Sequence, residues 1–227
     1  MCFAIAFPMM TLFVEWRWLR TGDRIYRTLA MRWSRVMLVL FAVGAISGTI
    51  LSFEFGILWP EFMARYGDVF GLAFAWEGYA FFIEAIFIAV YLYGWDRLPH
   101  RVHFLTGLPV VAGGVLSAYF VIAVNGWMNE PVGFSMVDGE VTDIDTWAIL
   151  TDNSFMWHEL VHMLLAGIMV AGFLVGTVYG WLWLKGRRTR YHRLALTVAL
   201  SVRGDRLTTA ARGGDRAGPL RRRRAAR

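Results

Sequence analysis

The sequence predicts an all-α protein, a polytopic transmembrane helix bundle with five spans and the start of a sixth. Its 227 residues are 57% hydrophobic and only 18% charged, a more apolar composition than that of ordinary soluble domains. Apolar runs also recur along the chain, and they reach or approach the ~20 residues that cross a hydrocarbon core of ~30 Å. Four of these runs lie at 36–50, 70–93, 104–124 and 163–184.

The first hydrophobic stretch, residues 1–16, is the shortest predicted span. As a helix it covers ~24 Å, which is less than the ~30 Å hydrocarbon core. A basic leader and a small-residue cleavage site are both missing around it, so the sequence does not predict a cleaved signal peptide. We therefore expect either local thinning of the bilayer around this span or further residues upstream.

The charges between the apolar runs alternate in sign and predict the orientation of the chain. Residues 16–35 contain six Arg and one Asp, whereas residues 125–157 contain six acidic side chains and no Lys or Arg. Basic residues also cluster at 94–103 and 185–193. Because basic loops stay on the cytoplasmic side, every span switches sides, and we expect the N-terminus on the periplasmic side.

The C-terminal segment, residues 201–227, differs in composition from the rest of the chain. It holds nine Arg and two Asp without an apolar period, so we expect residues 1–200 to form the membrane domain and 201–227 a basic disordered tail. An alternative is an out-of-frame translation, because a membrane helix begun at 191–200 would otherwise stop half-built. We expect no nucleic-acid partner, since nothing folded and polar precedes the run of four Arg at 221–224. The single cysteine, Cys2, excludes a disulfide framework.

Two glutamates lie inside the third span, where an ionisable side chain is costly and marks a candidate functional site. Glu77 and Glu84 are seven residues apart, which places them ~10 Å apart on nearly the same helix face. Neither has a Lys or Arg within one turn of its own helix. A stripe of two carboxyls suits a proton relay, metal coordination or packing around a cofactor. The alternative is that both only hydrogen-bond to neighbouring helices.

The fifth span opens with the string HELVH, residues 158–162, which permits two functional interpretations. It matches the H-E-x-x-H pattern of zinc metalloproteases, in which two His bind zinc and the Glu is the general base. A third zinc ligand is hard to find, because no Asp or Glu follows His162 before residue 201. The second interpretation makes His162 the axial ligand of a haem iron, with Ala166 and Gly167 one turn below leaving room for a flat ring. A purely hydrogen-bonding role for His162 also stays open.

A series of motifs resembles subunit I of cytochrome bd-type quinol oxidases, in order and with the family's spacing, across about residues 5–200. The block that ends in GWDR and the NGWM that follows it are the most specific. The WLRTGD loop is similar to the divergent, cyanide-insensitive-like branch. The other motifs are SGTILSFEFG from Ser47, YGDVFG from Tyr66, WEGYAFFIEAIFIAVYLYGWDRL from Trp76, VNGWMNEPVGF from Val124 and HELVHMLLAG from His158.

The resemblance implies roles for the candidate residues. His162 matches the axial histidine of a low-spin haem b near the outer face, and Glu77 and Glu84 match glutamates of the proton route and the surroundings of the high-spin haems. It further implies a multi-pass protein of the bacterial inner membrane, with oxidase subunit II as partner. In such enzymes electrons pass from ubiquinol or menaquinol through haem b to a high-spin haem b and haem d, where oxygen becomes water.

The chain also departs from the family pattern. No His precedes His100, although the family's first helix carries a haem-ligating His. The family's methionine opposite the low-spin haem, its long quinol-binding loop and a later haem-ligating glutamate belong to a C-terminal half that has no counterpart here. We therefore expect an incomplete copy of subunit I that, taken alone, does not turn over quinol and oxygen.

Overall fold

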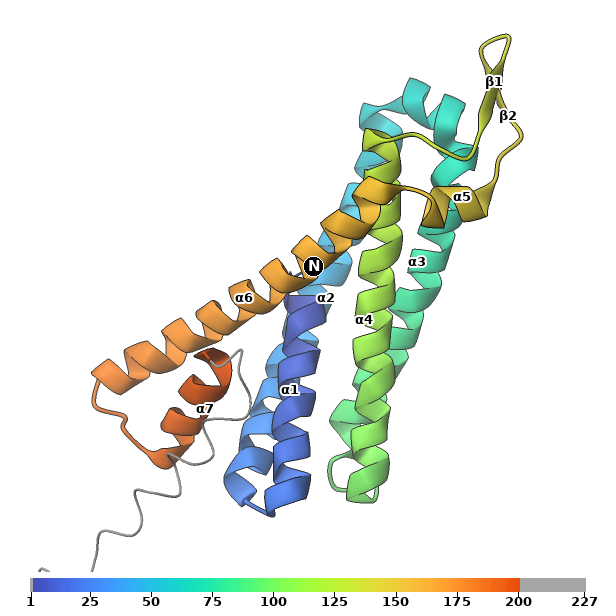
Figure 1. The fold of residues 1–227 in the computed structure, drawn as a ribbon. Helices are drawn as coiled ribbons and strands as arrows, with labels where there is room; N and C mark the ends of the chain where they lie inside the picture. The colour runs from blue at the N-terminus through green and yellow to red at the C-terminus, as the bar shows by residue number, and fades with distance from the viewer. Residues whose placement is uncertain (1, 201–227) are drawn as a thin grey trace, which may run out of the picture. The chain divides into compact units, whose positions relative to one another are not determined.

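The structure is a computed structural model of the protein and describes residues 2–200 (Figure 1). The chain divides into two compact units between Ala171 and Gly172, and their described parts are residues 2–171 and 172–200. In the first unit, α1 to α4 run side by side as long helices, and a small hairpin and a short helix follow them (Figure 1). The elements in chain order are α1 (Cys2–Thr21), α2 (Arg24–Leu58), α3 (Pro60–Gly94), α4 (His100–Asn129), β1 (Ser135–Val137), β2 (Glu140–Thr142), α5 (Thr146–Thr151), α6 (Ser154–Leu184) and α7 (Arg190–Leu200).

A two-residue turn joins α1 to α2. Gly22 has a φ of +68°, a conformation that favours glycine, and its N–H donates to the carbonyl of Trp18 at 2.8 Å. Asp23 then caps α2, because its Oδ1 accepts a hydrogen bond from the N–H of Ile25 at 2.9 Å. The basic segment expected as a loop is therefore mostly helical. α1 has 20 residues and covers ~30 Å, which is longer than the predicted apolar stretch because the helix continues through Arg17 and Arg20.

Only Trp59 separates α2 from α3. Pro60 occupies the first turn of α3. Backbone N–H groups in the first turn have no partner within the helix, so proline costs no hydrogen bond there. The N–H of Trp59 donates to the carbonyl of Phe55 at 3.1 Å and closes the end of α2. Residues 51–69, which lie between the predicted apolar runs at 36–50 and 70–93, are thus helical except for Trp59. Each helix has 35 residues and, at ~52 Å, is longer than the ~30 Å hydrocarbon core.

Glycines on α4 allow α3 and α1 to approach its backbone closely. A Cβ on Gly113 would lie 2.9 Å from the Cβ of Glu84 and 3.0 Å from the carbonyl oxygen of Ala80. A Cβ on Gly107 would lie 2.5 Å from the end of the Leu12 side chain on α1. Small residues at such crossings are typical of helix pairs in membranes. They decide which residues of α1 and α3 meet α4.

The acidic segment between α4 and α6 folds into the hairpin β1–β2 and the helix α5. Asp138 and Gly139 form its turn with φ values of 52° and 86°, and Val137 pairs with Glu140 on either side. An Asp-Gly pair with two positive φ angles is the preferred chemistry for a two-residue hairpin. Beneath this segment lies a core of side chains from α3, α4, α5 and α6: Val69, Phe70, Ala73, Ile122, Ala123, Val124, Trp127, Ile149, Leu150, Met156 and Leu160.

The second unit is described for residues 172–200 and also packs through glycine. A Cβ on Gly172 would lie 2.6 Å from the carbonyl oxygen of Ala199, and one on Gly176 would lie 2.8 Å from the side chain of Leu200. The last part of α6 therefore holds α7 against a face of small residues. α7 has 11 residues, as expected for the start of a sixth span.

Five helices are long and apolar enough to cross a membrane: α1, α2, α3, α4 and α6. The predicted all-α bundle of five spans is confirmed. Within residues 2–200, the short hairpin contains the only strands. The segment at 201–227, with both interpretations given for it, lies outside the described residues.

Candidate functional site

Glu84 is the most deeply buried of the predicted site residues. Its side chain is 3% exposed and lies on α3 against Gly113 and Gly114 of α4. Among residues 2–200, its Oε1 has no hydrogen-bond partner, and neither of the two ion pairs found there includes it. A buried carboxyl oxygen without a partner costs stability. The position of Glu84 therefore needs a functional reason.

Glu77 lies on the same face of α3. It is half-buried, and Ser117 of α4 lies beside its carboxyl group. Because Glu84 contacts Gly113 of the same helix, both glutamates face α4, as their seven-residue spacing predicts. The α3–α4 interface thus carries two carboxyls along one line.

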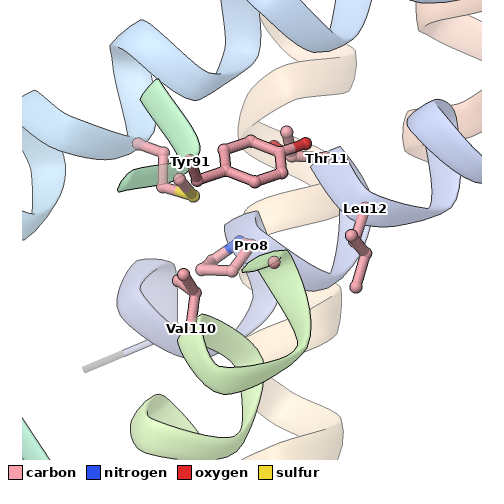
Figure 2. A pocket seen from close by; sticks show the side chains of 7 residues that line it. Pro8, Thr11, Leu12, Tyr91 and Val110 are labelled. Carbon is pink, nitrogen blue, oxygen red and sulfur yellow. The ribbon is translucent and has the colours of Figure 1, made fainter. Parts of the chain in front are cut away.

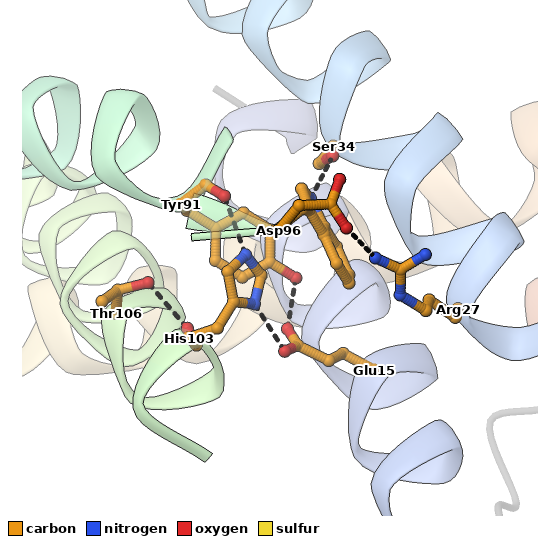
Figure 3. Close-up of polar contacts among 8 residues, drawn as sticks. Glu15, Arg27, Ser34, Tyr91, Asp96, His103 and Thr106 are labelled. Atoms are coloured by element: carbon orange, nitrogen blue, oxygen red, sulfur yellow. Dashed lines mark hydrogen bonds and ion pairs between the residues drawn. The ribbon is translucent and has the colours of Figure 1, made fainter. Parts of the chain in front are cut away.

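A third polar residue continues this line, and the sequence analysis missed it. Tyr91 follows Glu84 by another seven residues and belongs to a buried cluster with Glu15 of α1 and His103 of α4 (Figure 3). The Tyr91 hydroxyl donates to Glu15 Oε2 at 2.5 Å, and Glu15 Oε1 lies 2.7 Å from His103 Nδ1. All three side chains are at most 2% exposed. The cluster joins α1 to the consecutive helices α3 and α4.

The hydrogen bonds of His103 determine how many protons the cluster holds. Its Nε2 lies 2.8 Å from the backbone carbonyl of Tyr91, which can only accept, so Nε2 carries a proton. The short contact between Nδ1 and Glu15 needs one further proton, on either the ring or the carboxyl group. In both arrangements the pair has no net charge, which suits its burial.

Aromatic rings and an ion pair surround this cluster. The ring of Trp95 lies 4.2 Å from that of His103, and its Nε1 donates to Ser34 Oγ of α2 at 3.3 Å. Nearby, Arg27 of α2 pairs with Asp96 at 2.5 Å (Figure 3). The side chain of Asp96 is 78% exposed, so this end of the bundle reaches solvent within a short distance of the buried cluster.

A small cavity lies among α1 to α4 and is bordered by Tyr91 of the buried cluster (Figure 2). Its volume is about 10 Å³, close to the minimum that one water needs. The lining is mostly apolar, and the hydroxyl of Thr11 within it already donates to the carbonyl of Phe7 at 2.8 Å. The cavity is therefore too small for an organic ligand. It is lined by Pro8, Thr11, Leu12, Met37, Tyr91, Gly107 and Val110.

His162 lies on α6 with its side chain exposed, beside the exposed apolar side chains of Val161 and Leu165. No hydrogen bond found among residues 2–200 involves its imidazole. An unpartnered imidazole on an apolar helix face fits axial ligation of haem iron. A Cβ on Gly167, which was expected to leave room for the ring, would lie 3.5 Å from the Cα of Cys2 on α1, an ordinary contact distance.

Comparison with known proteins assigns the chain to a family. Residues 1–219 match the family model described as cytochrome bd terminal oxidase subunit I. A putative cytochrome bd menaquinol oxidase subunit I of Bacillus subtilis (strain 168) is 34% identical over 88% of this chain and 46% of that protein. The cytochrome bd ubiquinol oxidase subunit 1 of the same organism is 32% identical over 88% of this chain and 42% of that protein.

A solved structure agrees with these matches. The bd oxidase from Geobacillus thermodenitrificans superposes with a TM-score of 0.84 at 36% identity, and the match covers 87% of this chain and 46% of that chain. The fold, with its five candidate spans, defines a polytopic helical membrane protein. The chain belongs to the cytochrome bd terminal oxidase subunit I family. It spans about half the length of the relatives that it matches.

The zinc-protease interpretation of HELVH is wrong. The family assignment accounts for the whole segment, and the local geometry agrees with it. The carboxyl of Glu159, the supposed general base, lies 2.9 Å from the side-chain nitrogen of Asn125, once that amide is oriented to donate. Glu159 thus ties α6 to α4. Within the described chain, no group of three or more His, Cys, Asp or Glu could hold a metal ion, whereas a catalytic zinc needs three protein ligands.

Proposed function

We propose that this chain supplies the electron-entry and proton-handling region of a cytochrome bd-type quinol oxidase. The family match over residues 1–219 supports this proposal most directly. The proposed partners are ubiquinol or menaquinol as electron donor, oxygen as acceptor and oxidase subunit II in the membrane. The alternating charges between the spans favour an N-terminus on the periplasmic side of the bacterial inner membrane.

His162 is the proposed axial ligand of a low-spin haem b. Its imidazole is exposed, and the described chain provides no hydrogen-bond partner for it. The neighbouring Val161 and Leu165 are 56% and 58% exposed and give an apolar edge against which a flat ring packs. When bound, the haem supplies one-electron transfer from quinol toward the high-spin haem b and haem d of the oxygen site.

Glu77 and Glu84 are the proposed proton carriers. Burial opposes a charge on Glu84, which has no ion-pair partner among residues 2–200, so this residue holds a proton readily and releases it only to a suitable acceptor. Glu77 is half-buried and has the Ser117 hydroxyl beside it. Since the two residues are ~10 Å apart along α3, a proton that passes between them needs at least one intermediate group.

The first experiment tests the haem site on the full-length chain purified from membranes. We expect a haem b band in the reduced-minus-oxidised visible spectrum, lost in His162→Ala and kept in His158→Ala. His158 is the matched control, because it is also an exposed histidine on α6, one turn away. A haem b band that survives in His162→Ala would contradict the ligand assignment, and its absence from the unmodified chain would contradict the haem site. Quinol-dependent oxygen uptake after co-expression with subunit II tests the wider proposal.

A further inference from the structure

Two backbone features place an unused hydrogen-bond acceptor beside Glu84. The first is Pro8, which lies inside α1. Proline has no backbone N–H, so the carbonyl of Ala4, four residues earlier, lacks the donor that an α-helix normally supplies. A helix carbonyl of this kind, buried inside a bundle, needs a donor from elsewhere.

The second feature is Gly114 on α4, where the two unsatisfied groups meet. A Cβ at Gly114 would lie 3.1 Å from the carbonyl oxygen of Ala4 and 3.4 Å from Oε1 of Glu84. Both oxygens therefore border the small space that the missing side chain leaves. Oε1 is the atom of Glu84 that has no hydrogen-bond partner in the described chain.

We propose that the carbonyl of Ala4, freed by Pro8, accepts a hydrogen bond from the protonated carboxyl group of Glu84, either directly or through one water in the space beside Gly114. A carboxylate cannot donate, so two bare acceptor oxygens would face each other if Glu84 were ionised. With a proton on Glu84, one O–H donor serves both oxygens and removes two unsatisfied groups at once. The carbonyl thus favours the neutral acid over the carboxylate.

This inference rests on the proposed role of Glu84 as a proton carrier and makes it more specific. The proton-loaded form of Glu84 has a defined acceptor on α1. Pro8 is then a positioning residue, since it acts through the Ala4 carbonyl and does not itself touch the proton. Gly114 keeps the space between the two oxygens open.

The test is infrared spectroscopy of the carboxylic C=O stretch, on the full chain in a detergent without ester groups. The band of protonated Glu84 is the one that disappears in Glu84→Gln and moves in D₂O. We expect Pro8→Ala to shift this band to higher wavenumber. The substitution restores a backbone N–H, which competes for the Ala4 carbonyl and leaves the carboxylic acid of Glu84 more weakly hydrogen-bonded. Bands of a bridging water, sensitive to H₂¹⁸O, would identify the water-mediated form, and their absence would identify the direct bond.

Pro109→Ala is the matched control. Pro109 also lies inside a spanning helix, α4, and the carbonyl that it frees belongs to Leu105, an exposed residue at a different level of the bundle. We expect this variant to leave the Glu84 band in place. Gly114→Ala gives a second test, because its methyl group would enter the space between the two oxygens, and we expect the same shift.

Two results would overturn the inference. The first is that Glu84→Gln removes no band of a protonated carboxyl group. The second is that neither Pro8→Ala nor Gly114→Ala shifts the Glu84 band, although circular dichroism shows that both variants are folded. Either result leaves the haem b spectrum with its His162 dependence untouched. Failure of this inference and failure of the proposed haem site are therefore read from different signals.

Discussion

One end and the middle of the polar line on α3 differ in how their buried groups are satisfied. At one end, Glu15, Tyr91 and His103 pair every polar atom that they bury, through contacts of 2.5 to 2.8 Å. In the middle, Glu84 is equally hidden but keeps an oxygen without a partner in the described chain. A fully paired network stabilises one packing of the helices, whereas an unpaired group lowers stability and is kept for another reason. We therefore expect the cluster to hold the bundle together and Glu84 to serve the proposed proton chemistry.

The largest effect should come from breaking the paired cluster. His103→Ala removes one partner and leaves Glu15 buried with only the Tyr91 hydroxyl. Loss of one member of a buried ion pair typically costs about 3–5 kcal/mol, and we expect a loss of that size in the free energy of unfolding. Unfolding by SDS in mixed micelles, followed by circular dichroism, measures it.

Glu84→Gln is the control for this comparison. Glutamine keeps the shape and a hydrogen-bond donor, and no hydrogen bond between described side chains is lost. We expect the free energy of unfolding to change by no more than about 1 kcal/mol. If Glu84→Gln destabilised the chain as strongly as His103→Ala, the contrast between a structural cluster and a functional carboxyl would be wrong.

The helix spans were predictable because a long apolar run has few alternatives to a membrane helix. Their ends were not, because α1 continues through the basic residues beyond Trp16, and the turn at Gly22 and Asp23 takes only two residues. Side-chain charge marks where water begins, while hydrogen bonds and caps decide where a helix stops. Arg17, which is half-buried, and Arg20, which is exposed, lie over the ring of Trp16. Such long cationic side chains allow a helix to leave the membrane without unwinding.

Glu77 and Glu84 were found because an ionisable residue in a span is conspicuous by itself. Glu15 satisfied the same criterion, but it lay near the assumed end of the first span. His103 was grouped with a basic connection and is in fact buried in the first turn of α4. The pairing of the two joins residues 88 positions apart, and a single sequence carries no signal of such a contact. The seven-residue step from Glu84 to Tyr91 was the one local clue available.

A smaller effect should follow from filling the α3–α4 interface. Gly113→Ala places a methyl group 2.9 Å from the Cβ of Glu84 and 3.0 Å from the backbone oxygen of Ala80. Neither atom is the end of a flexible side chain, so the helices must move apart, at a cost of about 1–3 kcal/mol. The same SDS unfolding assay measures the loss.

Gly78→Ala provides the matched control on α3. Nothing lies within 4 Å of a Cβ at Gly78, and alanine is the better helix former by up to about 1 kcal/mol. We therefore expect Gly78→Ala to be neutral or stabilising. Equal losses at both positions would show that glycine matters here for a reason other than close packing.

The smallest effect should come from the exposed ion pair beside the buried cluster. Arg27 and Asp96 approach to 2.5 Å, but the Asp96 side chain is 78% exposed, so water and salt screen the attraction. We expect Asp96→Asn to lower the free energy of unfolding by about 0–1 kcal/mol, with the difference fading as the salt concentration rises. Arg27 also lies over the ring of Trp18, 5.5 Å from its centroid, which holds the guanidinium in place without its partner. A loss of free energy of unfolding that approaches the loss in His103→Ala and persists at high salt would contradict this expectation. It would mean that the Arg27–Asp96 pair belongs to the buried cluster and not to the solvated end of the bundle.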